Sequence, residues 1–303
     1  MRQRQSFVSR ETSVIRRMPN SQHQSQVSLF IAGPPKCATT WLYYCLREHP
    51  DVQTARTDEI MYFDMFHARG LDWYMDHYPP EARSAGHEKL LADTTSSYIW
   101  SARSAERIHS YNPDARIMVV LRNPVERAFS HYWHLKNRGL INYEFADILT
   151  NYQTFSCWLE PGFVNAGIKR YLNFFPREQM HFALFEDLRS KPVQSIKSVF
   201  QFAGIDADFL PPSTTREVNV AGPRKTLVNR VFSKAMRTAF GEERMNIRPG
   251  DTGMFAKVSG VLTGKSEYQQ GMDDSIRRQL QELAAPEIEE MEELTGFNLS
   301  HWS

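Results

Sequence analysis

Two segments of the chain each run from an apolar stretch, through a turn that carries a basic residue, into a helical pattern. In the first, residues 27–33 lead into a Gly-Pro-Pro turn, and Lys36 lies just ahead of residues with helical spacing. In the second, residues 117–121 lead directly into Arg122-Asn123-Pro124 and a further helical stretch. Free backbone N–H groups and the positive end of a helix dipole converge at such a turn, and a basic side chain adds charge. Both segments therefore predict binding sites for phosphate groups.

The elements that must position these turns alternate between strands and helices. Strands are expected at 27–33, 117–121 and 181–185, and helices at 38–48, from Pro124 to about residue 137, at 193–202 and at 273–293. Such alternation predicts a parallel sheet with helices on both faces, and ligands bind these sheets at the carboxyl ends of the strands. The predicted fold class is α/β, a P-loop-like three-layer fold with a central parallel sheet flanked by helices.

Domain organisation follows from shifts in composition along the chain. Residues 1–26 are rich in Arg, Ser, Gln and Asn, lack the apolar centre of a signal peptide, and are expected to be disordered. Residues 27–303 can bury one full core and are expected to form a single domain. Within it, the pattern weakens at 205–270 into basic, glycine-containing segments, which predicts a lid or an insertion that shapes the substrate site.

Charge and cysteine content exclude several classes of function. The 303 residues include 36 Lys and Arg against 35 Asp and Glu, a balance that gives no global field to draw the protein onto nucleic acid. No stretch approaches about 18 consecutive apolar residues, so no membrane-spanning helix is expected. The three cysteines, Cys37, Cys45 and Cys157, lack metal-ligand spacing and fit reduced thiols in a cytoplasmic protein.

The first turn differs from a Walker A loop, in which Gly-Lys-Ser/Thr begins the helix, because Lys36 here comes three residues after Gly33 and precedes the helix. Instead it resembles the Pro-Lys-x-Gly-Thr-Thr-x-Leu turn of sulfotransferases that use 3'-phosphoadenosine 5'-phosphosulfate (PAPS), above all the soluble bacterial type of the glycan branch related to heparan sulfate sulfotransferases. That resemblance implies that the turn grips the 5'-phosphosulfate through Lys36, Cys37, Ala38, Thr39, Thr40 and Trp41. Ala38 stands where the family usually has Gly, so either the backbone is helical there or the loop is slightly displaced.

The second turn resembles the family's Arg-Asn-Pro-x-x-Arg-x-x-Ser-x-Tyr motif, which implies that Arg122 and Ser130 hold the 3'-phosphate. The forked guanidinium of an arginine suits phosphate oxygens, in agreement with this role. Late in the chain, Thr263-Gly264-Lys265-Ser266 faintly resembles the family's basic loop over the nucleotide. Lys265 is therefore expected to contact the donor.

The expected catalytic residues are Glu59 and Lys36. The segment 58–64 resembles the one that carries the catalytic glutamate of glycan sulfotransferases, and Glu59 falls on that position. A hydroxyl acceptor needs its proton removed, so a carboxylate within hydrogen-bond reach is the expected general base. Lys36 is expected to stabilise the negative charge on the departing phosphate. Met61 replaces a family His, and Thr94 replaces a family Lys, so the acceptor is expected to differ from heparan.

The predicted function is transfer of a sulfuryl group from PAPS to a hydroxyl of a carbohydrate or other small metabolite, with no metal required. Two alternatives are a P-loop nucleotide-dependent kinase, which would depend on Mg²⁺, and a non-catalytic nucleotide-binding protein. Nothing in the sequence indicates an oligomeric state.

Overall fold

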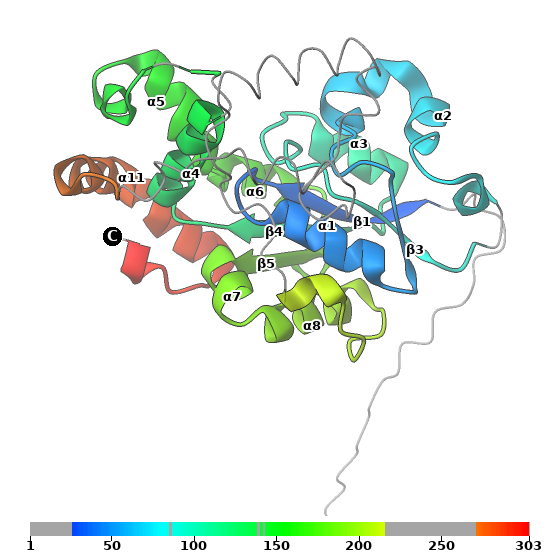
Figure 1. The fold of residues 1–303 in the computed structure, drawn as a ribbon. Coiled ribbons are helices and arrows are strands. Elements are labelled where there is room, and N and C mark those ends of the chain that lie inside the picture. Colours follow the sequence, from blue (N-terminus) through cyan, green and yellow to red (C-terminus); the bar gives the residue numbers. More distant parts are fainter. Residues whose placement is uncertain (1–25, 85–86, 138–139, 142, 216–270, 303) are drawn as a thin grey trace, which may run out of the picture.

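The centre of the molecule is a five-stranded, fully parallel sheet in the order β2-β3-β1-β4-β5. A computed structural model describes residues 26–84, 87–137, 140–141, 143–215 and 271–302 of the chain. The strands, seen edge to edge in Figure 1, are β1 (Val27–Gly33), β2 (Val52–Thr54), β3 (Leu90–Asp93), β4 (Arg116–Leu121) and β5 (Met180–Leu184). The predicted α/β class with a parallel sheet is confirmed.

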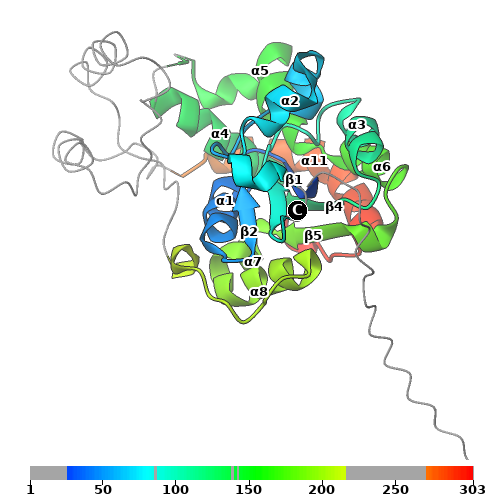
Figure 2. The same cartoon turned by 90° about the vertical axis from the view of Figure 1, so that its right-hand side faces the viewer.

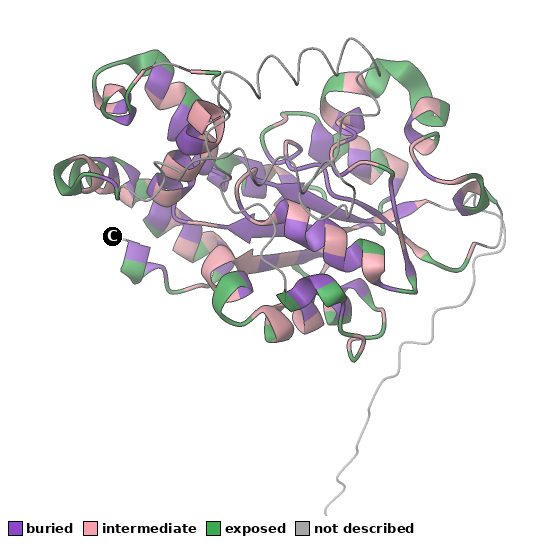
Figure 3. Ribbon diagram, viewed as in Figure 1, coloured by how far each residue is buried: buried purple, intermediate pink, exposed green. Residues whose placement is uncertain are grey.

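Helices cover both faces of the sheet and complete three layers (Figures 1 and 2). One face packs against α1 (Thr39–Glu48), α7 (Phe185–Ser190) and α8 (Pro192–Ala203). The other packs against α3 (Ser104–Tyr111), α4 (Pro124–Asn137), α6 (Asn165–Leu172) and α11 (Asp274–Thr295). Figure 3 shows the central strands largely buried between these layers, as continuous apolar runs predict, whereas the edge strand β5 is half-buried at His181, Ala183 and Leu184.

Shorter elements fill the connections. They are a π-helical turn at Tyr62–Phe66, the helices α2 (Gly70–Met75) and α5 (Tyr152–Trp158), and 3₁₀ turns at His67–Arg69, Pro80–Arg83, Phe145–Leu149, Glu160–Gly162, Arg177–Gln179, Pro212–Thr215 and Ser300–Trp302.

The elements that were predicted agree closely with observed ones, but the strands β2 and β3 and the helices α2, α3 and α5 were missed. The first strand and the end of α4 at Asn137 lie where expected, and Gly204, in the left-handed conformation, ends α8. The strands β2 and β3, of 3 and 4 residues, were not predicted because each is too short to show an apolar pattern. Of the predicted disordered segment 1–26, all but the last residue lies outside the described residues, as does most of the lid expected at 205–270.

The order of the strands fixes where the two basic turns lie. β1 pairs with β4 along its length, and both strands run in the same direction. Their carboxyl ends therefore meet at one edge of the sheet, and the turns that follow them are neighbours. In the part of the chain that the structure describes, no helix is long and apolar enough to cross a membrane.

Candidate active site

The turn after β1 has an unusual backbone. Lys36 and Ala38 both adopt the left-handed conformation, with φ of 72° and 62°. Of the two alternatives for Ala38, a right-handed helical backbone is therefore excluded, and the left-handed conformation costs a non-glycine residue about 1 kcal/mol. Gly33 is required at the start of the turn, because a Cβ atom there would lie 1.8 Å from the backbone oxygen of Ser96.

The N-terminus of α1 begins directly after this turn and is open to an anion. Among the described residues, no side chain caps it, so its first N–H groups are available to a ligand. The side chains of Cys37 and Trp41 point elsewhere: both are buried in the core, and the Trp41 indole donates to the backbone oxygen of Ser213 at 2.9 Å. Burial raises the pKa of the Cys37 thiol to about 12, so it is not a thiolate nucleophile. These two residues can contact an anion only through their backbone.

The two basic turns touch each other. Arg122, at the end of β4, donates from Nη1 to the backbone oxygen of Lys36 at 2.6 Å. Its guanidinium lies 4.1 Å from the centre of the Phe185 ring, which fixes its plane. The Lys36 ammonium in turn lies 3.3 Å from Nδ1 of His134 on α4. Residues from three elements thus meet at one end of the sheet, as the spacing of the two turns predicted.

Positive groups are concentrated around this meeting point. Burial, followed by the nearby charges of Arg127, Lys36 and His134, lowers the pKa of His131 to about 3. Arg127 is fully buried, and burial lowers its pKa to about 10. Within the described residues, Nε of Arg122 and both Nε and Nη1 of Arg127 have no hydrogen-bond partner. Arg127 is enclosed by protein, whereas Arg122 is half-buried and can contact a ligand, with the carboxylate of Glu186 nearby.

Glu59 lies at the rim of the same site. Its carboxylate accepts hydrogen bonds from the backbone N–H of Ser96, at 3.1 Å, and from the Ser96 hydroxyl. Ser96 is also the residue against which Gly33 packs, so the Glu59 carboxylate lies beside the start of the Lys36 turn. Burial raises the pKa of Glu59 to about 7, and Asp58 and Asp93 add to the rise, although the bonds from Ser96 oppose it. This pKa suits a general base at neutral pH.

Asp58, the residue before Glu59, is hydrogen-bonded to the first turn of α1. Thr40 donates from Oγ1 to the carboxylate of Asp58 at 3.3 Å. Thr94, where the family has a lysine, donates its hydroxyl to the backbone oxygen of Asp58 at 3.0 Å. The hydroxyl of Thr40, which was expected to contact phosphate, is therefore directed at Asp58 in this structure.

The other predicted residues have different outcomes. Thr39 is buried at the start of α1, and Ser130 is half-buried on α4, in the same β4–α4 unit as Arg122. Lys265 lies outside the described residues. The contacts of His134, Arg127 and Ser96 were not foreseen, although Arg127 lies within the motif that carries Arg122 and His134 lies two residues after its end.

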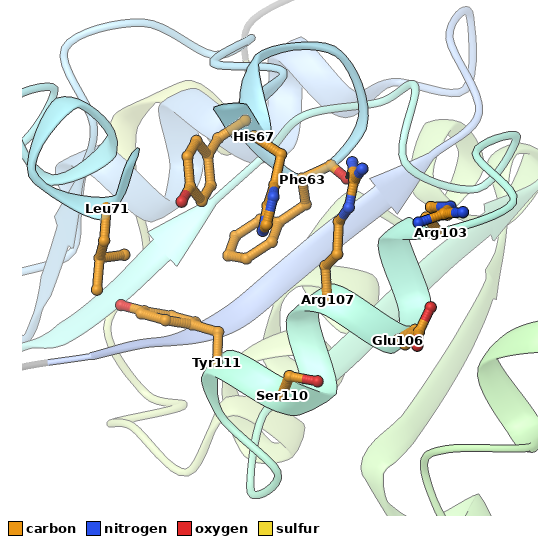
Figure 4. Close-up of a pocket in the computed structure, with 9 residues that line it drawn as sticks. Phe63, His67, Leu71, Arg103, Glu106, Arg107, Ser110 and Tyr111 are labelled. Atoms are coloured by element: carbon orange, nitrogen blue, oxygen red, sulfur yellow. Dashed lines mark hydrogen bonds between the residues drawn. The ribbon is translucent and has the colours of Figure 1, made fainter. Parts of the chain in front are cut away.

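A separate cavity of about 400 Å³ lies between the π-helical turn and α3 (Figure 4). Its wall includes aromatic rings of Tyr62, Phe63 and Tyr111 and the side chain of Arg107. None of the predicted donor-binding residues lines it. Among the described residues, no group of three or more His, Cys, Asp or Glu side chains is arranged to hold a metal.

The sequence was also compared with those of known proteins. Residues 26–291 match the family model described as Sulfotransferase domain. A human protein, bifunctional heparan sulfate N-deacetylase/N-sulfotransferase 2, is 30% identical over 193 residues, which cover 58% of this chain and 22% of the human protein. A membrane-associated sulfotransferase, kil1, from Dictyostelium discoideum is 32% identical over 117 residues, 37% of this chain and 25% of that protein. The chain thus spans about a quarter or less of the length of these relatives.

Among solved structures, a sulfotransferase from Alicyclobacillus acidocaldarius is similar in fold. It superposes with a TM-score of 0.65 at 24% identity, over 91% of this chain and 98% of that one. The resemblance to sulfotransferases, including those of heparan sulfate, is confirmed, and it favours that activity over a kinase or a non-catalytic protein. Since the family model spans most of the chain, the protein belongs to the sulfotransferase family.

Proposed function

We propose that the enzyme takes its sulfuryl group from PAPS and transfers it to a hydroxyl of a carbohydrate or other small metabolite. The observation that carries this proposal is the contact between Arg122 and the backbone of Lys36, which brings two anion-binding turns together. PAPS carries phosphates at both ends of one ribose, so a single donor offers an anion to each turn. The charge of the half-buried Arg122, together with the uncapped N-terminus of α1, supports an anionic ligand here.

In the proposed assignment, the Lys36 turn and the N-terminus of α1 bind the 5'-phosphosulfate, and Arg122 with Ser130 binds the 3'-phosphate. Lys36 stabilises the charge that develops on the phosphate oxygen as the bond to sulfur breaks. Lys265 remains a predicted donor contact. The proposed reaction requires no metal.

Glu59 is the proposed general base. The acceptor oxygen forms a bond to sulfur while its proton passes to the Glu59 carboxylate, and the bond between sulfur and the 5'-phosphate oxygen breaks. The products are the sulfate ester and 3'-phosphoadenosine 5'-phosphate (PAP). A carboxylate with a pKa of about 7 accepts a proton better than an ordinary glutamate does, because its basicity is higher.

A second candidate acceptor is an amine of an amino sugar. The human relative is named as a heparan sulfate N-sulfotransferase, and a glycan acceptor of that kind presents a nitrogen. The same base serves this reaction, since an amine also loses a proton on sulfation. The three cysteines are all unpaired, which supports the proposal that the enzyme works in a reducing compartment such as the cytoplasm.

A thermal-shift comparison tests the donor. PAP is expected to raise the melting temperature in the absence of Mg²⁺, and by more than ADP or ATP at equal concentration, because a ligand that binds the folded state stabilises it. The variant Arg122→Ala should lose most of this shift. Arg47→Ala removes one positive charge from the last turn of α1, at the end away from the Lys36 turn, and serves as the matched control. Stabilisation by ATP with Mg²⁺, and none by PAP, would contradict the proposal.

A further inference from the structure

A buried carboxylate lies at the end of β3, next to the segment that carries Glu59. Asp93 is 1% exposed, and among the described residues no basic side chain pairs with it. It is instead surrounded by hydrogen-bond donors. Oδ1 accepts from the backbone N–H of Thr95 at 2.9 Å and from its hydroxyl at 2.7 Å, and Oδ2 accepts from the hydroxyls of Tyr74 and Tyr98, each at 2.9 Å.

Two of these hydroxyls also hold the backbone directly after Glu59. Oγ1 of Thr95 accepts from the N–H groups of Ile60 and Met61, at 3.0 and 3.3 Å. The hydroxyl oxygen of Tyr98 accepts from the N–H groups of Tyr62 and Phe63, at 3.1 and 3.4 Å. Four consecutive backbone N–H groups are thus bound by two side chains.

The backbone fixes the direction of the bonds through Thr95 and Tyr98. A backbone N–H can only donate, so the lone pairs of the Thr95 and Tyr98 hydroxyls face residues 60–63. The single proton of each hydroxyl must then point at Asp93. Burial raises the pKa of Asp93, and the hydrogen bonds from Thr95, Tyr74 and Tyr98 oppose that rise. Asp93 therefore orients both hydroxyls by accepting their protons.

The backbone held in this way is strained. Met61 has a φ of 58°, a left-handed conformation that costs a non-glycine residue about 1 kcal/mol or more. Such a conformation persists only where the surroundings over-determine it. Arg107 on α3 adds a further constraint, donating to the backbone oxygens of Phe63 and Asp64 at 2.7 and 3.0 Å (Figure 4).

We infer that Asp93 is the positioning residue for Glu59: through Thr95 and Tyr98 it fixes residues 60–63, and so aims the Glu59 carboxylate. Ser96, three residues beyond Asp93 on the same loop, binds that carboxylate directly. One loop therefore holds both the side chain of the base and the backbone that follows it. The inference rests on the proposed function only for the role of Glu59.

Hydrogen exchange of residues 60–63, followed by mass spectrometry, tests the positioning without any acceptor. Tyr98→Phe should speed exchange at Tyr62 and Phe63 by about fivefold or more, because the N–H groups lose their acceptor. Tyr74→Phe is the matched control. It removes a hydroxyl that is equally buried and that donates to the same oxygen of Asp93, but no N–H of residues 60–63 depends on it.

The Thr95 and Asp93 variants complete the series. Thr95→Val should speed exchange at Ile60 and Met61, and Thr95→Ser, which keeps the hydroxyl, should restore protection. Asp93→Asn should loosen all four amides, because its NH₂ group faces donors. Equal exchange in the Tyr98→Phe and Tyr74→Phe variants would overturn the inference.

Measurement of kcat distinguishes a role of Asp93 in positioning Glu59 from a role in the stability of the fold alone. PAP release from PAPS is measured with heparosan, with N-deacetylated heparosan, and with water alone as the acceptor. Tyr98→Phe and Thr95→Val should lower kcat about tenfold or more, because a misplaced base loses its reactive geometry. PAP affinity should be unchanged, and Tyr74→Phe and Thr95→Ser should stay near wild type.

The outcomes distinguish the two claims. If Tyr74→Phe lowers kcat as much as Tyr98→Phe does, Asp93 acts only through general stability and the inference fails. If wild-type protein does not bind PAP, the proposed donor is wrong, whereas the exchange measurement still decides whether Asp93 fixes residues 60–63.

Discussion

Glu59 owes its basicity to its surroundings and its place to Ser96. Removal of its carboxylate from water, together with two neighbouring acidic residues, raises the pKa to about 7, although the hydrogen bonds from Ser96 oppose the rise. Two donors on Ser96 hold both oxygens, so the side chain is fixed as well as basic. In the proposed reaction the acceptor then competes with Ser96 for one of these oxygens.

Replacement of Glu59 by Gln should remove most of the turnover and leave the donor site intact. We expect kcat to fall by about a hundredfold or more, the usual contribution of a positioned general base. Affinity for PAP, measured by calorimetry, should not change, because Lys36 and Arg122 hold the donor. Glu282→Gln, on the exposed side of α11, is the control. Near-normal turnover in Glu59→Gln would show that another group takes the proton.

The pH dependence of kcat/KM should report the same carboxylate. Glu59 must be deprotonated to act, and its raised pKa of about 7 means that activity falls as the pH drops through neutrality. An ordinary glutamate would keep full activity down to about pH 5. Initial rates with PAPS across the neutral range check this. A profile that stays flat through neutral pH would contradict the role of Glu59 as base.

At the scale of elements, the turn from β1 into α1 keeps a left-handed residue where the side chain is an alanine. The backbone there is imposed by the connection between Gly33, which packs on Ser96, and the start of α1 at Thr39. The sequence pattern left open whether the backbone of Ala38 is helical or the loop is displaced, because the methyl group of alanine is compatible with either backbone conformation.

Replacement of Ala38 by Gly should stabilise the protein by about 0.5–1 kcal/mol. The gain is the relief of a left-handed alanine, reduced by the greater freedom of glycine in the unfolded chain. Urea unfolding with and without the substitution checks it. Ala285→Gly, within the right-handed helix α11, should instead destabilise by about 1 kcal/mol. A loss of stability in Ala38→Gly would mean that the turn does not need a left-handed residue.

At the scale of the whole molecule, the sheet order explains the site. The central strands β1 and β4 have long apolar runs, and the sequence therefore predicted both strands, both turns and their common edge. The contacts around Asp93 were not predictable, because they join residues about 35 positions apart through β3, a strand too short to recognise. The contacts of the Thr40 hydroxyl and the Trp41 indole were not predictable for a similar reason: their partners, Asp58 and Ser213, are distant in sequence.

A set of four calorimetric titrations tests most directly whether the two turns hold the two ends of one nucleotide. PAP and 5'-AMP, which lacks the 3'-phosphate, are titrated into wild-type protein and into Arg122→Ala. Relative to wild type, the Arg122→Ala variant should lose at least about tenfold more affinity for PAP than for 5'-AMP. This difference is expected when a charge-assisted bond to the 3'-phosphate is removed. Equal losses for the two nucleotides would mean that Arg122 supports only the Lys36 turn, and that the 3'-phosphate binds elsewhere.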